Sequence, residues 1–161
     1  MTPTFAALEY RLNQASPAEL AQHLSRCDGH FVPRLSAGVN IGDYAKKIAK
    51  QATRFEAWAD GSLVGLVAAY CNDQETRVAY LTNMSVSREW MGKGVAACLL
   101  SQCCKHAAAS GMRQIRLEVA EENTPATKLY EKCGFVADGA NGPFVGMTLD
   151  LKGGKANEKK A

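Results

Sequence analysis

Apolar positions recur along the chain with two periods, one typical of helices and one typical of strands. The stretch ASPAELAQHLSRC has the helical period, with Leu20 and Leu24 on one face. Ser16 is a preferred N-cap residue, and Pro17 suits the first helical position. Glu19 stands three positions after Ser16, which completes a capping box. The first helix is therefore expected to begin next to Ser16.

The later stretches predict a succession of strands and helices. Asp60 and Gly61 separate two extended runs, which is the strongest short signal for an antiparallel hairpin. Thr124, as N-cap, and Pro125 are expected to open a short helix that Gly134 closes. The other expected elements are a helix over 41–52, a strand over 77–86, a helix from about Gly94 to Ser110, and strands over 114–120, 135–138 and 144–151. The order β-α-α-β-β-β-α-β-α-β-β predicts the mixed α/β class, with helices on both faces of a sheet.

One loop between the first two expected helices carries an unusual amount of apolar surface. Its sequence is GHFVPRLSAGVN, in which Phe31, Pro33 and Leu35 stand among polar residues. Such a loop either packs against the domain or lines a pocket.

Length and composition favour one globular domain. The chain has 161 residues and is 47% hydrophobic, which suits a single domain over residues 1–151. The net charge of +3 comes from residues 152–161, since 15 basic and 15 acidic residues remain without them. This Gly- and Lys-rich tail is expected to be disordered. The neutral body gives no reason to expect a nucleic-acid partner.

No signal peptide or membrane segment is expected from the sequence. The start MTPTFAALEY lacks a basic region followed by an apolar one, and no apolar run reaches about 18 residues. We therefore expect a cytoplasmic protein without membrane contact. The six cysteines form no CxxC pair and are expected to be free thiols. Cys103 and His106 have helical spacing, but further ligands are missing nearby, so no metal is expected.

The stretch VSREWMGKGVAACLL predicts an anion site. Glycines just before a helix allow backbone N–H groups to approach phosphate, where the helix dipole favours negative charge. A kinase-type P-loop does not fit, because Ser87 replaces its first glycine and Gly94 follows Lys93. Gly92, Gly94 and Ala97 fit the dinucleotide pattern GxGxxG/A, with Glu118 on the next strand. That alternative is weak, because the residues SREWM intervene and a hairpin precedes the strand.

Two separated motifs carry a family resemblance. The run LTNMSVSREWMGKGVAACLL, followed by LEVAEENTPATKLYEKCGF, resembles the GNAT superfamily of acetyl-CoA-dependent N-acetyltransferases. The resemblance covers about Phe55 to Phe135 and includes the order of elements. It implies a mixed, mostly antiparallel sheet and acetyl-CoA as co-substrate, without a metal.

The same resemblance assigns the cofactor residues. The family pattern Q/R-x-x-G-x-G/A falls on Met91, Gly92, Lys93, Gly94, Val95 and Ala96, whose main-chain N–H groups would hold the pyrophosphate. Met91 departs from the usual Gln or Arg, which removes a side-chain contact but no backbone donor. The strand residues Met84, Ser85 and Val86 would pair with the pantetheine arm. Asn123 would hydrogen-bond this arm, and the small Ala126 would let it lie against the helix.

The chemistry needs a neutral amine, a polarised carbonyl and a proton for the leaving thiolate. Tyr130 suits the last role, one helical turn after Ala126, because a phenol stays protonated at neutral pH. A main-chain N–H of Met84 or Ser85 would polarise the carbonyl. Glu118 or a water chain is the candidate general base. Strict alternation would place Tyr80, Thr82 and Met84 on one strand face, with Leu81 and Asn83 on the other.

The acceptor is expected beside the loop between the first two helices. The candidate contacts are His30, Phe31, Arg34, Tyr44, Tyr70 and Asn83. A neutral body favours a small-molecule amine, such as an amino sugar, polyamine or amino acid, and leaves protein amines and a homodimer open. The alternative function is an acetyl-CoA-binding sensor without turnover.

Overall fold

The computed structural model describes residues 7–151 of the chain. The expected disordered tail, residues 152–161, lies outside the described residues. The strands are β1 (Glu9–Leu12), β2 (Thr53–Ala59), β3 (Ser62–Tyr70), β4 (Val78–Val86), β5 (Gln114–Ala120), β6 (Val136–Asn141) and β7 (Phe144–Asp150). The α-helices are α1 (Pro17–Cys27), α2 (Ile41–Gln51), α3 (Val95–Ala109) and α4 (Thr124–Lys132). Short 3-10 helices follow as η1 (Asp28–His30), η2 (Leu35–Ala37) and η3 (Arg88–Trp90).

Within residues 7–151 the strands form one seven-stranded sheet, in the order β1-β2-β3-β4-β5-β7-β6. Neighbouring strands are antiparallel except for β4 and β5, which are parallel. The succession of α-helices and strands along the chain is the predicted one. The expected α/β class with a mostly antiparallel sheet is confirmed.

Local chemistry explains where the first elements begin and turn. Ser16 Oγ accepts a hydrogen bond from Glu19 N at 3.1 Å, and Glu19 Oε1 accepts one from Ser16 N at 2.9 Å. The predicted capping box is therefore confirmed. Asp60 and Gly61 connect β2 and β3 with φ angles of 51° and 73°. Positive φ at both positions is typical of the type I′ hairpin turn, whose twist matches that of the strands.

The predicted N-cap of α4 is wrong. Asn123, not Thr124, occupies this position, and its Oδ1 accepts a hydrogen bond from Ala126 N at 3.4 Å. Asn and Thr are both common N-cap residues, so the sequence alone does not show which of Asn123 and Thr124 caps α4. Pro125 fits the first turn in either register, because N–H groups there have no partner inside the helix.

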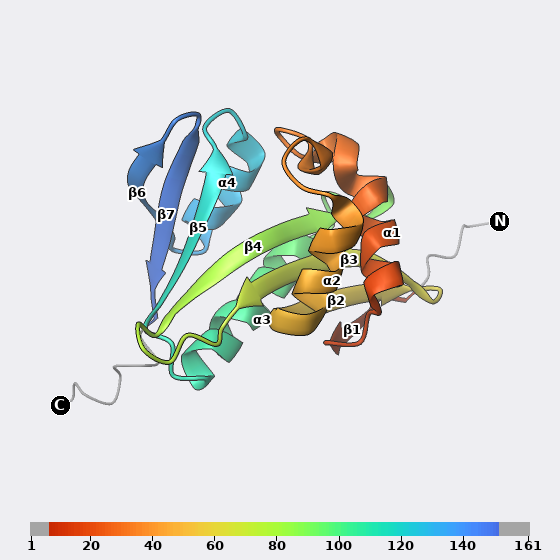
Figure 1. Cartoon of the computed structure of the whole chain (residues 1–161), viewed down its shortest axis with the longest axis horizontal. Helices are drawn as coiled ribbons and strands as arrows, with labels where there is room; N and C mark the ends of the chain where they lie inside the picture. Colours follow the sequence, from red (N-terminus) through yellow and green to blue (C-terminus); the bar gives the residue numbers. More distant parts are fainter. Residues whose placement is uncertain (1–6, 152–161) are drawn as a thin grey trace.

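Helices cover both faces of the sheet (Figure 1). On one face α3 and α4 pack over the strands, where Leu99 and Val67 belong to one buried cluster. On the other face α1 and α2 contribute Leu24 and Ile48 to a second cluster that includes Leu66. Leu66 and Val67 are neighbours in β3, and successive strand residues point to opposite faces.

A β-bulge interrupts β4 at Thr82. Ala68 and Ala69 are adjacent in β3, but they pair with Asn83 and Leu81 of β4. Thr82 is therefore the extra residue of the bulge. An extra residue of this kind bends its strand and increases the local twist.

The bulge overturns the expected alternation in β4. Leu81 and Met84 both pack in the cluster beneath α3, whereas strict alternation puts them on opposite faces. Asn83 lies on the other face, where it is hydrogen-bonded to Ser85. The prediction that grouped Tyr80 with Met84 is thus wrong, because one inserted residue reverses the faces of all that follow.

The strands β4 and β5 separate just before the bulge. They pair only where Val78–Tyr80 meets Gln114–Arg116 within the described range. Beyond these residues they diverge, with α1 and α2 beside β4 and α4 beside β5 (Figure 1). The site lies at this opening.

Candidate active site

Two adjoining cavities occupy the opening between β4 and β5. The larger measures about 510 Å³ and the smaller about 300 Å³. Four residues line both cavities and mark their junction: Phe31, Met84, Asn123 and Ala126. A molecule bound in one cavity would therefore meet a molecule bound in the other.

The larger cavity ends at the predicted glycine turn. Gly92 and Gly94 have φ angles of 75° and 82°, and a Cβ at either position would meet no atom within 4 Å. Only glycine adopts such positive φ angles without strain, so both residues suit this turn. The first hydrogen bond inside α3 runs from Cys98 N to Gly94 O, so the N–H groups of residues 95–97 precede it. This turn has the open space and the backbone donors of an anion site.

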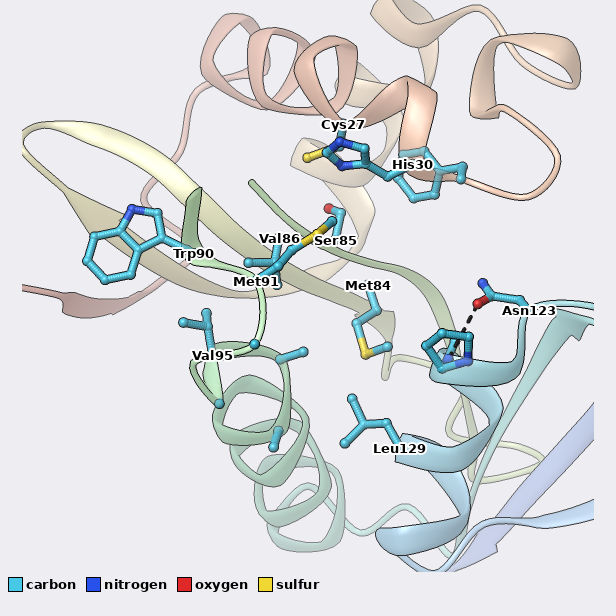
Figure 2. Close-up of a pocket in the computed structure, with 17 residues that line it drawn as sticks. Cys27, His30, Met84, Ser85, Val86, Trp90, Met91, Val95, Asn123 and Leu129 are labelled. Atoms are coloured by element: carbon cyan, nitrogen blue, oxygen red, sulfur yellow. Dashed lines mark hydrogen bonds between the residues drawn. The ribbon is translucent and has the colours of Figure 1, made fainter. Parts of the chain in front are cut away.

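Most of the predicted cofactor residues line the larger cavity. They are Met84, Ser85, Val86, Met91, Gly92, Gly94, Val95, Ala96, Asn123 and Ala126. Lys93 is exposed and lies outside the lining, and Tyr130 lines the smaller cavity. Figure 2 shows Met84 in the middle of the larger cavity, between Val95 of α3 on one side and Cys27 of α1 and His30 of η1 on the other.

The exposed edge of β4 offers backbone donors to the larger cavity. Ser87 N donates a hydrogen bond to Val64 O at 2.8 Å, toward β3. N–H groups alternate between the two edges of a strand, so Ser85 N also points toward β3. By the same alternation, the N–H groups of Met84 and Val86 point to the edge from which β5 has separated. Of the two candidates for polarising a carbonyl, this orientation favours Met84.

A buried polar network supports the bulge from the side of α1. Ser85 Oγ donates a hydrogen bond to Asn83 Oδ1 at 2.9 Å, and His23 Nε2 lies 2.9 Å from Ser85 Oγ. Because the hydroxyl proton goes to Asn83, the imidazole donates to Ser85. Burial, and then the nearby Arg26 charge, lower the pKa of His23 to about 4. The ring is therefore neutral at physiological pH.

Tyr130 and Glu118 meet the smaller cavity from α4 and β5. The ring of Tyr130 packs edge-on against Phe135, with 5.6 Å between centroids. Burial is the main cause that raises the pKa of Tyr130, so the hydroxyl keeps its proton at neutral pH. Within residues 7–151 no hydrogen bond involves this hydroxyl. Glu118 is exposed, and its Oε2 accepts a hydrogen bond of 3.4 Å from Asn141 Nδ2.

The predicted acceptor residues separate into four groups. Phe31 lines both cavities, Arg34 and Asn83 line the smaller one, and His30 lines the larger one. Tyr44 and Tyr70 are absent from the described lining of both cavities.

Both alternatives for the apolar loop before α2 hold. Phe31, Pro33 and Leu35 all line the smaller cavity. Phe31 and Leu35 also pack against the buried cluster of α1 and α2.

Several residues of the larger cavity were not singled out from the sequence. They are Cys27, Trp90, Pro125 and Leu129. Leu129 lies three residues after Ala126 on α4, so helical periodicity could have indicated it. Cys27 comes from a distant helix, and no local pattern connects it with the glycine turn.

Within residues 7–151, no group of three or more His, Cys, Asp or Glu side chains could hold a metal ion. No helix in this range is long and apolar enough to cross a membrane.

Comparison with known proteins identifies the family. The model of the acetyltransferase (GNAT) family matches residues 18–135, which include the glycine turn, both cavity-lining strands and α4. The chain belongs to the GNAT family. The family resemblance drawn from the two motifs is confirmed.

Named relatives within the GNAT family share parts of this chain. Human N-acetylaspartate synthetase is 36% identical over 94 residues, which cover 57% of this chain and 31% of that protein. The match thus spans about a third of that relative. Streptothricin acetyltransferase of Escherichia coli is 28% identical over 141 residues, covering 76% of this chain and 79% of the relative.

A solved structure has the same fold. PaiA N-acetyltransferase from Thermoplasma acidophilum, in complex with coenzyme A, superposes with a TM-score of 0.69. The superposition covers 89% of this chain and 99% of the other, at 17% sequence identity.

Proposed function

We propose that this protein transfers the acetyl group of acetyl-CoA to a primary amine of a small molecule, by direct attack in a ternary complex. The observation that carries the proposal is the junction of the two cavities. A cavity with an anion site at one end meets a second cavity at Phe31, Met84, Asn123 and Ala126. Two substrates can then react without a covalent enzyme intermediate.

The larger cavity fits coenzyme A by its donors and its shape. Backbone N–H groups at the start of α3, together with Gly92 and Gly94, would hold the pyrophosphate. The N–H groups of Met84 and Val86 would pair with the pantetheine arm along the free edge of β4. Ala126 leaves room for this arm beside α4, and Asn123 lies next to it. Acetyl-CoA supplies the acyl group as a thioester.

Proton transfer is assigned to two residues of the smaller cavity. The amine nitrogen forms a bond to the carbonyl carbon, the carbon–sulfur bond breaks, and the thiolate takes a proton. Tyr130 would donate that proton, since burial keeps its hydroxyl protonated. Glu118, or water reached through it, would remove the proton from the attacking amine. Met84 N–H would polarise the carbonyl.

The comparisons support the cofactor more than the acceptor. PaiA, which has the same fold, was solved in complex with coenzyme A. The names of the relatives point to different acceptors, N-acetylaspartate synthesis in one and streptothricin in the other. We therefore take a primary amine as the acceptor class and transfer neither named substrate to this chain.

Ligand-induced stabilisation tests the cofactor. Acetyl-CoA should raise the melting temperature, because binding to the native state stabilises it by mass action. NADH and NADPH should leave the melting temperature unchanged. The opposite pattern would support the dinucleotide interpretation of the glycine turn.

A thiol-release screen tests turnover. Acetyl-CoA should release free thiol only when a suitable primary amine is present. Stabilisation by acetyl-CoA without thiol release, across small amines and peptides, would contradict catalysis and favour a sensor of acetyl-CoA.

A further inference from the structure

The smaller cavity carries little charge among its described lining residues. Glu118 is the only carboxylate that lines either cavity in this part of the chain. None of the ion pairs found in residues 7–151 involves Glu118. The carboxylate is therefore available for one ammonium group and not for two.

Arg34 is the single cationic residue among the described lining residues of the smaller cavity, and its guanidinium lies near the carboxylate of Asp28. Arg34 Nη1 lies 3.8 Å from Asp28 Oδ2. The same nitrogen lies 3.6 Å from the position of a Cβ on Gly29. An acceptor carboxylate would have to compete with Asp28 for this guanidinium.

Several oxygens at the wall of the smaller cavity already have hydrogen-bond partners, whereas the Tyr130 hydroxyl has none among the described residues. Tyr44 OH donates a hydrogen bond to Thr82 O at 2.9 Å and lies 2.8 Å from Thr82 Oγ1. Asn83 Oδ1 accepts from Ser85, and Asn123 Oδ1 accepts from the backbone of α4. A sugar with several hydroxyls would find few acceptors here, and unpartnered polar groups are costly to bury.

Apolar side chains form the larger part of the remaining wall of the smaller cavity, beside polar atoms such as the Tyr130 hydroxyl. The set comprises Phe31, Val32, Pro33, Leu35, Val39 and Phe144. Val32 and Val39 are 41% and 37% exposed, so large apolar groups stand open at the cavity. Sites for small molecules are lined mostly by apolar groups, with a few polar groups that fix orientation.

We infer that the acceptor is a primary monoamine with an apolar or aromatic body and without a carboxylate. This inference rests on the proposed function, because it takes the smaller cavity as the acceptor site. Glu118 attracts the amino group, and the apolar wall covers the rest of the molecule. Polyamines, amino sugars and free amino acids are disfavoured, because each adds a charge or polar group that this wall does not match.

Matched pairs of amines test the inference by their kcat/KM values. Pentylamine and putrescine have the same number of heavy atoms and differ by one terminal ammonium. The kcat/KM value for pentylamine should exceed that for putrescine by about 100-fold, since the second ammonium of putrescine would be buried without a partner. Phenethylamine should exceed phenylalanine, and cyclohexylamine should exceed glucosamine. From propylamine to pentylamine, each methylene should add about fourfold, which is the transfer free energy of one buried CH₂.

A variant pair connects this preference with the cavity. Val39→Asp adds a second carboxylate at the wall and should shrink the pentylamine-to-putrescine ratio by about threefold to fivefold, the gain expected from one partly exposed charge pair. Val136→Asp is the control, because Val136 is 62% exposed on β6 and outside the lining of both cavities described here. Its ratio should equal that of the wild type.

The outcomes separate the inference from the proposed function. Faster turnover of putrescine, glucosamine or phenylalanine than of their apolar partners would overturn the inference and leave the acetyltransferase proposal intact. An unchanged ratio in Val39→Asp would also overturn it. Absence of thiol release with every amine would contradict both.

Discussion

Tyr44 on α2 donates a hydrogen bond of 2.9 Å from its hydroxyl to the carbonyl oxygen of Thr82, the extra residue of the β4 bulge. Burial raises the pKa of Tyr44 to about 12, so this hydroxyl remains a donor at neutral pH. The bond connects the helix α2 with the point at which β4 leaves β5. Tyr44 therefore acts on the site through the backbone, without lining either described cavity.

Removing this hydroxyl should weaken the fold and the site together. Tyr44→Phe should lower the free energy of unfolding by about 1 kcal/mol, because a buried carbonyl loses its donor. The value of kcat/KM should also fall, since the bulge orients Met84. Urea unfolding and steady-state kinetics measure the two effects. Tyr80→Phe is the control, because Tyr80 is 41% exposed. Equal stability of the two variants would argue against a supporting role for Tyr44.

Tyr130 should act in the chemical step. Tyr130→Phe retains the ring that packs against Phe135 and removes one hydroxyl. The value of kcat should fall by about 100-fold with little change in acetyl-CoA affinity. Single-turnover rates are the proper measurement, because product release can hide the chemical step. A single-turnover rate equal to that of the wild type would leave protonation of the thiolate to water.

Replacing Gly94 should weaken cofactor binding by more than the backbone strain of the substitution explains. Gly94→Val places a branched side chain at φ 82° and beside the proposed pyrophosphate site, so acetyl-CoA affinity should fall at least about tenfold. Gly139→Val is the matched control, because Gly139 has φ 92° and equally open space for a Cβ. Calorimetric titration compares them. Similar affinities in the two variants would mean that the turn contacts no phosphate.

Acid should destabilise the protein through His23. Its pKa is about 4 in the folded state, against about 6.5 in an unfolded chain. The unfolded chain therefore binds a proton at a higher pH, and the stability present above about pH 6.5 is lost as the pH falls toward 4. Between about pH 7 and pH 5 the free energy of unfolding should drop by about 2 kcal/mol from this group.

A variant isolates this contribution. His23→Gln removes the titrating group that Arg26 and Cys27 neighbour, so the drop in the free energy of unfolding should be smaller by that amount. Urea titrations at the two pH values measure it. The same pH dependence in the variant and the wild type would exclude His23 as the cause.

Local chemistry made much of the fold predictable. Ser16 and Glu19 fix the start of α1, and Asp60 with Gly61 fixes the hairpin of β2 and β3. The turn at Gly92 was predictable because glycine readily adopts the positive φ that this turn before α3 requires. In each case a few adjacent residues determine a conformation through their own hydrogen bonds or φ angles.

Features that depend on distant contacts were missed. Thr82 carries no signal of a bulge, because the register between β3 and β4 is set by packing on both faces of the sheet. Cys27 reaches the larger cavity only because α1 packs across the sheet. Phe31 lines both cavities and Tyr130 only the smaller one, and these positions likewise depend on how far β5 diverges from β4.

The most direct test of the account is to measure both products of one reaction. The protein, acetyl-CoA and phenethylamine are incubated together, free thiol is titrated, and the N-acetylated amine is quantified by mass spectrometry. The account predicts equal amounts of thiol and amide, with both rates reduced together in Tyr130→Phe. Thiol without amide would contradict it, and so would the absence of both products with phenethylamine and every other amine tested while acetyl-CoA still raises the melting temperature.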